Sequence, residues 1–139
     1  MTTKAGTYGL LKNGANTIAN LKDVNMDHSI EIQDVSVLGT VGYRSKRPTF
    51  KDWSMSATGY WDPDDTLGQV ALETAMIAGT QVTVKFYPSA TSGTPTTGDV
   101  YYTGNGYITG YPINTSFENL VEISLTIEGD GALTRGVEV

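Results

Sequence analysis

The sequence predicts a mainly β fold, a β-sandwich or barrel-like domain with one flanking α-helix. Apolar residues recur at every second position in several segments, which is the period of a half-buried strand. Glycine is abundant, with 16 residues among 139, as in folds built from many short strands and turns. Only one segment combines helical periodicity with signals for both helix ends. The length is that of one domain, so we expect residues 1–139 to form a single unit.

Three segments show the two-residue period most clearly. In "WSMSATGYW" (53–61), one face carries Trp53, Met55, Ala57, Gly59 and Trp61. In "LVEISLTIE" (120–128), the inward positions are Val121, Ile123, Leu125 and Ile127. In "QVTVKFY" (81–87), they are Val82, Val84 and Phe86. Each segment is therefore predicted to be a strand with one buried face.

Two other β segments carry irregular signals. In "SIEIQDVSVLG" (29–39), the apolar alternation slips by one residue between Gln33 and Asp34, which predicts a β-bulge there. The Gly- and Tyr-rich "VYYTGNGYITGYPI" (100–113) predicts a hairpin or bent pair of strands that turns at "GNG". We expect a polar loop at 88–99 and a second, longer connection at about 38–51.

The segment "WDPDDTLGQVALETAMIAGT" (61–80) predicts the helix, at about residues 63–78. Asp62 suits the N-cap, Pro63 the first helical position, and Gly79 the C-terminal end. The apolar positions that fall on one helical face are Leu67, Val70, Ala71, Ala75 and Ala78. We expect this face to pack on the sheet.

The charge distribution restricts the partners of the chain. A net charge of −6 and a pI near 4.5 disfavour general affinity for nucleic acid or anionic lipid. Four of the nine basic residues nevertheless lie in "RSKRPTFK" (44–51), namely Arg44, Lys46, Arg47 and Lys51. We expect this segment to act locally, against an acidic protein surface. The alternative is a solvated loop whose charges contribute little.

The composition also restricts compartment and chemistry. The chain has no cysteine, which excludes disulfides and thiolate sites and fits a reducing compartment. No apolar run reaches the ~18 residues of a membrane span, and the N-terminus has no signal-peptide pattern, so we expect a soluble protein. His28 is the only histidine, and the acids of residues 62–73 fit a calcium loop poorly because Leu67 occupies its glycine position. We expect no catalytic residues, no metal, no cofactor and no enzyme activity.

The order of the elements carries a resemblance. The strand "SIEIQDVSV" precedes a long basic loop and then "DWSMSATGYWD", which runs into a short helix ending "AGTQVTV"; the chain closes with "ENLVEISLTIEGDGAL". Together these segments resemble the major tail tube protein of long-tailed (siphovirus-type) bacteriophages, over nearly the whole chain. That family is similar in fold to the tube protein of type VI secretion, which is the nearest competing identity.

The resemblance implies a structural virion protein that forms hexameric rings, stacked into the hollow tail tube through which the genome is ejected. It implies assembly in the host cytoplasm, contacts with tail tip, tape measure and tail terminator proteins, and transient passage of DNA. In this family the loop between two main strands reaches a neighbouring subunit or ring. The corresponding inter-subunit loop here is 38–51, with Arg44, Lys46, Arg47 and Lys51.

A tube wall must let a polyanion slide without sticking, so its lumen face should lack Lys and Arg. The outward positions of the candidate lumen strands meet this condition. They are Glu31, Gln33, Ser54, Ser56, Thr58, Thr109, Glu122, Ser124 and Thr126. We expect residues 1–16 and the tail at about 135–139 to be mobile alone and ordered by contact.

A different function class remains open from the residues alone. A small acidic β-sandwich with two tryptophans and eight tyrosines fits a carbohydrate-binding module that uses exposed aromatic rings. Against it, Trp53 and Trp61 fall on the apolar face of one predicted strand, where core packing is expected.

Overall fold

The computed structural model describes residues 9–37, 42–90 and 94–139. Its elements, in chain order, are β1 (Leu10–Asn13), β2 (Asn16–Thr17), β3 (Leu21–Asp34), β4 (Lys46–Tyr60), α1 (Gln69–Ala78), β5 (Val82–Tyr87), β6 (Val100–Gly110), β7 (Ile113–Asn114), β8 (Glu122–Gly129) and β9 (Thr134–Val137). The fold is mainly β with one short helix, as the sequence predicts. The predicted mobile segments at 1–16 and 135–139 contain β1, part of β2 and part of β9, while residues 1–8 lie outside the described residues.

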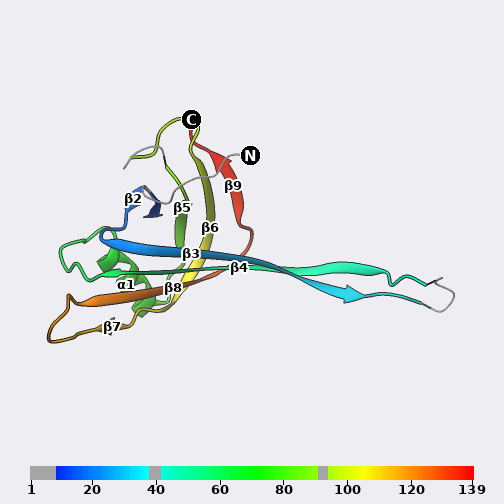
Figure 1. Ribbon diagram of the computed structural model, residues 1–139, viewed down its shortest axis with the longest axis horizontal. Coiled ribbons are helices and arrows are strands. Elements are labelled where there is room, and N and C mark those ends of the chain that lie inside the picture. The colour runs from blue at the N-terminus through cyan, green and yellow to red at the C-terminus, as the bar shows by residue number, and fades with distance from the viewer. Residues whose placement is uncertain (1–8, 38–41, 91–93) are drawn as a thin grey trace.

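All strands belong to one antiparallel sheet in the order β2-β1-β5-β6-β8-β4-β3, with β7 added to β8 and β9 added to β6. Strand β6 joins the two parts of this sheet, because residues 102–106 pair with β5 while residues 106–110 pair with β8. In Figure 1, β5 and β6 cross the direction of β3, β4 and β8 steeply, and α1 lies at the end of the domain away from the long hairpin. The bent sheet therefore encloses a core on one face of β4 and β8.

The core confirms the predicted alternation in three strands. Met55 and Ala57 of β4, and Ile123, Leu125 and Ile127 of β8, are almost fully buried. They are joined by further buried residues, which include Leu11, Ile18, Leu72, Val82, Val84 and Ile108. Burial of this apolar surface, at about 25 cal/mol per Å², is the main force that stabilises the domain.

The two tryptophans differ in environment, contrary to the prediction that both pack in the core. Trp53 is 4% exposed, and its indole N–H donates to the carbonyl of Gly131 at 3.2 Å. Trp61 is 42% exposed, because β4 ends at Tyr60 and the chain turns away from the sheet. The alternation therefore holds only as far as the strand itself.

The predicted helix starts too early. Helix α1 begins at Gln69 and not at residue 63, while its end at Ala78 followed by left-handed Gly79 (φ 71°) is as predicted. Asp62 makes a local turn instead of a cap, since its carboxylate accepts the N–H of Asp64 at 3.0 Å. The later start changes the buried face, which is centred on Gln69 and Leu72, whereas Leu67 is exposed. No helix within the described residues is long and apolar enough to cross a membrane.

Gln69 is buried because it connects three segments of backbone. Its amide nitrogen donates to the carbonyls of Ala19 (2.8 Å) and Tyr60 (2.9 Å), and its amide oxygen accepts the N–H of Asp62 (2.8 Å). Asp65 supports the same junction, since one carboxylate oxygen accepts the backbone N–H groups of Gln69 and Ala19. These bonds fix α1 to the start of β3 and the end of β4.

Two local predictions in the β segments are wrong. The bulge lies in β4, where Thr49 and Phe50 oppose Glu31, because the register shifts between Ile30 and Ile32 and pairing at Gln33 and Asp34 is regular. The "GNG" segment forms no turn, since β6 runs continuously through residues 104–106. Its glycines serve close packing instead: a Cβ on Gly104 would lie 2.6 Å from the ring of Trp53.

Candidate assembly surfaces

The first candidate surface is a two-stranded arm formed by β3 and β4. Strand β4 pairs with β8 only from Ser54 to Tyr60, so the hairpin beyond this point has no third strand beside it among the described residues. We define the arm as residues 29–37 and 42–52; it projects from the domain at the right of Figure 1. Residues 46–51 of the predicted loop at 38–51 are therefore strand, because β4 begins at Lys46. Residues 38–41 lie outside the described residues.

The arm exposes apolar side chains along its length. Ile30 is 45% and Ile32 is 56% exposed, and their cross-strand partners are Lys51 and Pro48. The other exposed apolar residues of the arm are Val35, Val37, Tyr43 and Phe50. A run of exposed apolar side chains on a projecting hairpin is typical of a protein interaction site. The sequence predicts the apolar positions but places them on a half-buried strand.

The basic residues of the arm do not form a single cluster. Arg44 pairs within the arm with Asp34 at 3.4 Å. Hydrogen bonds from Ser36, and to a smaller extent the charge of Lys46, lower the pKa of the Asp34 carboxyl below its usual value. Lys46 lies opposite Asp34, and Arg47 lies opposite Gln33. The arm therefore satisfies part of its own charge, and Lys46, Arg47 and Lys51 carry the remaining positive potential.

The second candidate surface is the solvent face of β3, β4 and β8. Its cross-strand rows are Asp23–Thr58–Ser124, Asn25–Ser56–Thr126 and Asp27–Ser54–Glu128, with Glu122 opposite Tyr60. We call this surface the polar face. It contains six of the predicted lumen residues, namely Ser54, Ser56, Thr58, Glu122, Ser124 and Thr126. Thr109 of β6 is adjacent, because its hydroxyl lies 3.5 Å from the carbonyl of Thr126.

Glu31 and Gln33 are not part of this group. They lie on the arm, where their cross-strand neighbours are in the part of β4 that does not pair with β8. The sequence prediction instead missed Asp23, Asn25 and Asp27, because β3 begins at Leu21 and not near Ser29. The sequence does contain the pattern that predicts this longer strand, since Val24 and Met26 alternate with these polar residues.

The charge of the polar face is predominantly negative. Its acids are Asp23, Asp27, Glu122 and Glu128. The neighbouring cation is Lys22, which lies 3.5 Å from the Glu122 carboxylate and 5.3 Å from the centre of the Tyr60 ring. A surface of hydroxyls and carboxylates offers phosphate groups little attraction.

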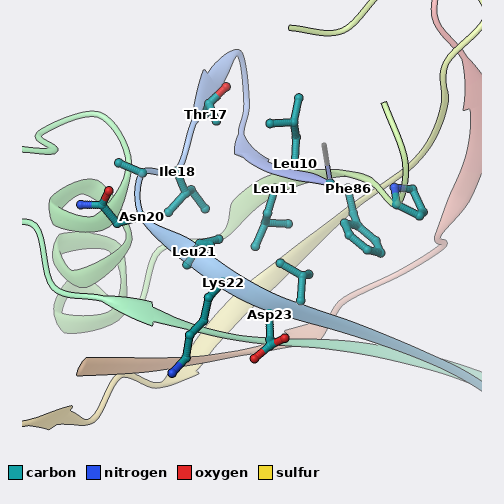
Figure 2. A pocket seen from close by; sticks show the side chains of 13 residues that line it. Leu10, Leu11, Thr17, Ile18, Asn20, Leu21, Lys22, Asp23 and Phe86 are labelled. Atoms are coloured by element: carbon teal, nitrogen blue, oxygen red, sulfur yellow. The ribbon is translucent and has the colours of Figure 1, made fainter. Parts of the chain in front are cut away.

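A cavity lies between the β1–β2 hairpin and β3. It has a volume of about 460 Å³, and its apolar lining includes Leu10, Leu11, Ile18, Leu21 and Phe86. Figure 2 shows Lys22 and Asp23 on the opposite side of β3 from Leu11 and Phe86. Within the described residues there is no group of three or more His, Asp or Glu side chains that could hold a metal ion. Polar side chains also line this cavity, among them Thr17, Asn20, Lys22 and Asp23.

Taken together, the bent antiparallel sheet, the projecting arm and the polar face define a structural β domain that associates through its surfaces. A family model described as "Phage tail tube protein" matches residues 4–135. The chain therefore belongs to the phage tail tube protein family, whose members are structural, non-enzymatic components of the virion tail. This confirms the resemblance to tail tube proteins and overrides the carbohydrate-binding alternative.

Solved structures share the fold at low sequence identity. A chain of the virion of a native gene transfer agent particle matches with a TM-score of 0.78 and 21% identity, covering 96% of this chain and 99% of that chain. A chain of the tail of an empty gene transfer agent particle with C6 symmetry matches with a TM-score of 0.77 and 21% identity, covering 95% and 98%. The SPP1 tail tube matches with a TM-score of 0.73 and 18% identity, covering 99% and 81%. The search of curated proteins found no match.

Proposed function

We propose that this chain forms hexameric rings that stack into the hollow tube of a phage tail, with the polar face toward the channel. The family match supports the tube, and the C6 symmetry of the similar gene transfer agent tail supports six copies in a ring. The observation that carries the proposal is the polar face itself. It is a broad surface of hydroxyls and carboxylates in a family whose members build conduits.

The chemistry of the polar face suits passage of DNA. Ser54, Ser56, Thr58, Ser124 and Thr126 give short neutral side chains. Asp23, Asp27 and Glu128 repel phosphates, while Glu122 is paired with Lys22. An aromatic and basic groove would instead bind single strands by stacking and charge neutralisation. Thr109, at the edge of this surface, is proposed to line the channel as well. Glu31 and Gln33 lie on the arm and are therefore assigned to the arm rather than to the channel lining.

The arm is proposed to join neighbouring copies. Its apolar side chains are exposed in the single chain, and Lys46, Arg47 and Lys51 can meet acids of another copy. Each exposed ion pair contributes only about 0.2–1 kcal/mol, but rotational symmetry repeats it at every interface. Arg44 is proposed to contribute mainly by fixing the arm through Asp34.

The partners at the ends of the tube are proposed from the resemblance to tail tube proteins. Tail tip and tail terminator proteins would close the two ends, and a tape measure protein would occupy the channel during assembly in the host cytoplasm. DNA would pass through transiently during genome ejection.

Electron microscopy of the purified chain, with a gel-retardation assay on free DNA, tests this function. The wild-type chain should form rings or tubes and should not retard DNA. Replacement of Arg44, Lys46 and Arg47 by Ala should leave the fold intact and weaken tube formation. Replacement of Lys12, Lys85 and Arg135 by Ala is the matched control, because it removes the same charge away from the arm.

Tube formation should also weaken as salt shortens the screening length from about 10 Å to about 3 Å. Two outcomes would overturn the proposal. One is a wild-type chain that forms neither rings nor tubes at any salt concentration. The other is unchanged assembly of the arm variant together with loss of a DNA retardation that the wild type shows, since this would make the arm a nucleic-acid site.

A further inference from the structure

We infer that an apolar pocket at the end of the domain opposite the arm receives the arm of a second copy. The inference rests on the proposed function and names the partner surface of the arm. The occupant is the row formed by Ile30, Ile32 and Pro48. The acceptor is the pocket lined by Asn20, Tyr60, Trp61, Leu120 and Val121, which we call the end pocket.

The end pocket exposes apolar surface that no described residue of the same chain covers. It has a volume of about 400 Å³, and Trp61 and Leu120 are 42% and 67% exposed. Phe117, in the same β7–β8 connection as Leu120, is also fully exposed. Trp61 lies here because the chain leaves the sheet directly after Tyr60. Aromatic side chains such as Tyr60 and Trp61 are enriched at the centre of protein interfaces.

The surroundings of the end pocket are acidic. Asp62 follows Trp61 and accepts a hydrogen bond from Asn20, a lining residue, at 3.3 Å. Asp64 lies two residues further along the same turn, and Glu118 lies two residues before Leu120; both are exposed. The nearby cation Lys22 is paired with Glu122. A positively charged ligand surface is therefore favoured at this pocket.

The arm has the complementary chemistry. Ile30 and Ile32 lie two residues apart on β3 and so share one face of the hairpin, with Pro48 opposite Ile32. Lys51 lies opposite Ile30 and so shares the face of the apolar row, whereas Arg47, next to Pro48, lies on the other face of the hairpin. The row fits an apolar pocket, and Lys51 fits its acidic border.

The positions of the two surfaces favour a contact between copies. In Figure 1 the arm projects from one end of the domain, while the β7–β8 connection and the turn that follows β4 lie at the other end. The arm therefore does not reach the end pocket of its own chain. Two different surfaces on one chain give a head-to-tail contact, which repeats around a closed ring or along a stack. A self-complementary dimer would need one surface that pairs with itself.

Cysteine cross-linking tests the pairing, and the chain contains no cysteine that would interfere. The Ile32→Cys/Leu120→Cys variant, oxidised after assembly, should give a ladder of covalent oligomers on a non-reducing gel. The matched control is Ile32→Cys/Thr97→Cys, in which the second thiol lies on an exposed loop away from the end pocket. It should give no ladder. A mixture of the two single variants, Ile32→Cys and Leu120→Cys, should give covalent dimers only.

A charge exchange tests the same contact without a thiol. Lys51→Glu and Asp64→Lys should each reduce tube yield at least several-fold at low salt, and an equimolar mixture of the two should regain much of the loss. Assembled tubes without the ladder and without recovery in the mixture would refute the end pocket as acceptor while leaving the tube function intact. A wild-type chain that never assembles would instead refute the proposed function.

Discussion

The contact between Trp53 and two glycines is the most sharply defined feature of the core, and its removal has a calculable cost. Trp53 is 4% exposed, and a buried tryptophan removes about 150–250 Å² from water. Truncation of such a residue to Ala typically costs about 3–5 kcal/mol, which includes the cavity left behind. The lost hydrogen bond to Gly131 leaves a carbonyl that water can reach only in part. Since a domain has about 5–15 kcal/mol of stability, Trp53→Ala should remove a large fraction of it.

The glycines provide a second measurement on the same contact. A Cβ at Gly129 would overlap the Trp53 indole, so Gly129→Ala should cost about 1–3 kcal/mol through overpacking. The cost should fall sharply in the Trp53→Ala background, because the new methyl group then enters the vacated space. The double-mutant cycle should therefore show a coupling of at least about 1 kcal/mol.

Urea unfolding monitored by far-ultraviolet circular dichroism measures these changes, at protein concentrations below those that allow assembly. Trp61→Ala is the control, and it should cost only about 1 kcal/mol because the ring is half exposed. A cost below about 1 kcal/mol for Trp53→Ala, or additive effects of Trp53→Ala and Gly129→Ala, would show that the described packing is wrong. Normal stability together with loss of sugar binding would revive the carbohydrate-binding alternative.

Three other predictions follow from the polar face and the interior. Ser56→Lys and Thr126→Lys should leave folding and tube formation intact, because outward polar positions tolerate exchange within about 0.5 kcal/mol. Particles that carry these changes should nevertheless eject DNA poorly, and normal infectivity would show that these residues do not line the channel. Gln69→Ala should cost about 2–4 kcal/mol in urea unfolding because it leaves the carbonyls of Ala19 and Tyr60 unpaired, and a neutral result would contradict the junction described. Burial, reinforced by the charge of Glu73, raises the pKa of Tyr111 to about 12. The stability that this shift contributes is fully present below the pKa of about 10 that tyrosine has in the unfolded chain, and it is lost as the pH rises toward 12. Tyr111→Phe should reduce the fall in melting temperature between pH 9 and about 11.5, and an unchanged fall would refute this.

The sequence predicted best where a strand has one buried face along its whole length. Met55, Ala57 and the apolar residues of β8 alternate regularly because the core lies against them throughout. The same reasoning failed for Ile30 and Ile32, which also alternate with polar residues but lie where the β3–β4 hairpin extends beyond β8. Periodicity reports that a face is apolar, and it does not report whether the covering surface belongs to the same chain.

Local signals were less reliable where a residue had a tertiary partner. The acids at 62–65 resemble a helix start, but Asp65 instead accepts N–H groups from Gln69 and from the distant Ala19. Gly104, Asn105 and Gly106 resemble a turn, but Gly104 makes room for Trp53. The roles of Asp65 and Gly104 are decided by partners far away along the chain. Local spacing alone therefore could not distinguish a helix start from a tertiary contact, or a turn from a continuous strand.

The basic segment illustrates the limit for the candidate site. Four cations within residues 44–51 predicted a charged loop, and the structure distributes them along an arm in which Arg44 pairs internally. The end pocket had no sequence signal, because Trp61 and Leu120 lie almost 60 residues apart and meet only when β4 pairs with β8. A pocket formed by the segment after β4 and the segment before β8 can be recognised only from the three-dimensional structure.

The orientation of the polar face is the central claim, and a cryo-electron microscopy reconstruction of tubes assembled from the wild-type chain tests it most directly. The reconstruction should show six copies per ring, with Ser56, Thr58, Ser124 and Thr126 directed into the channel. A tube whose channel is lined by other strands, with the polar face on the outside or buried between copies, would contradict the account.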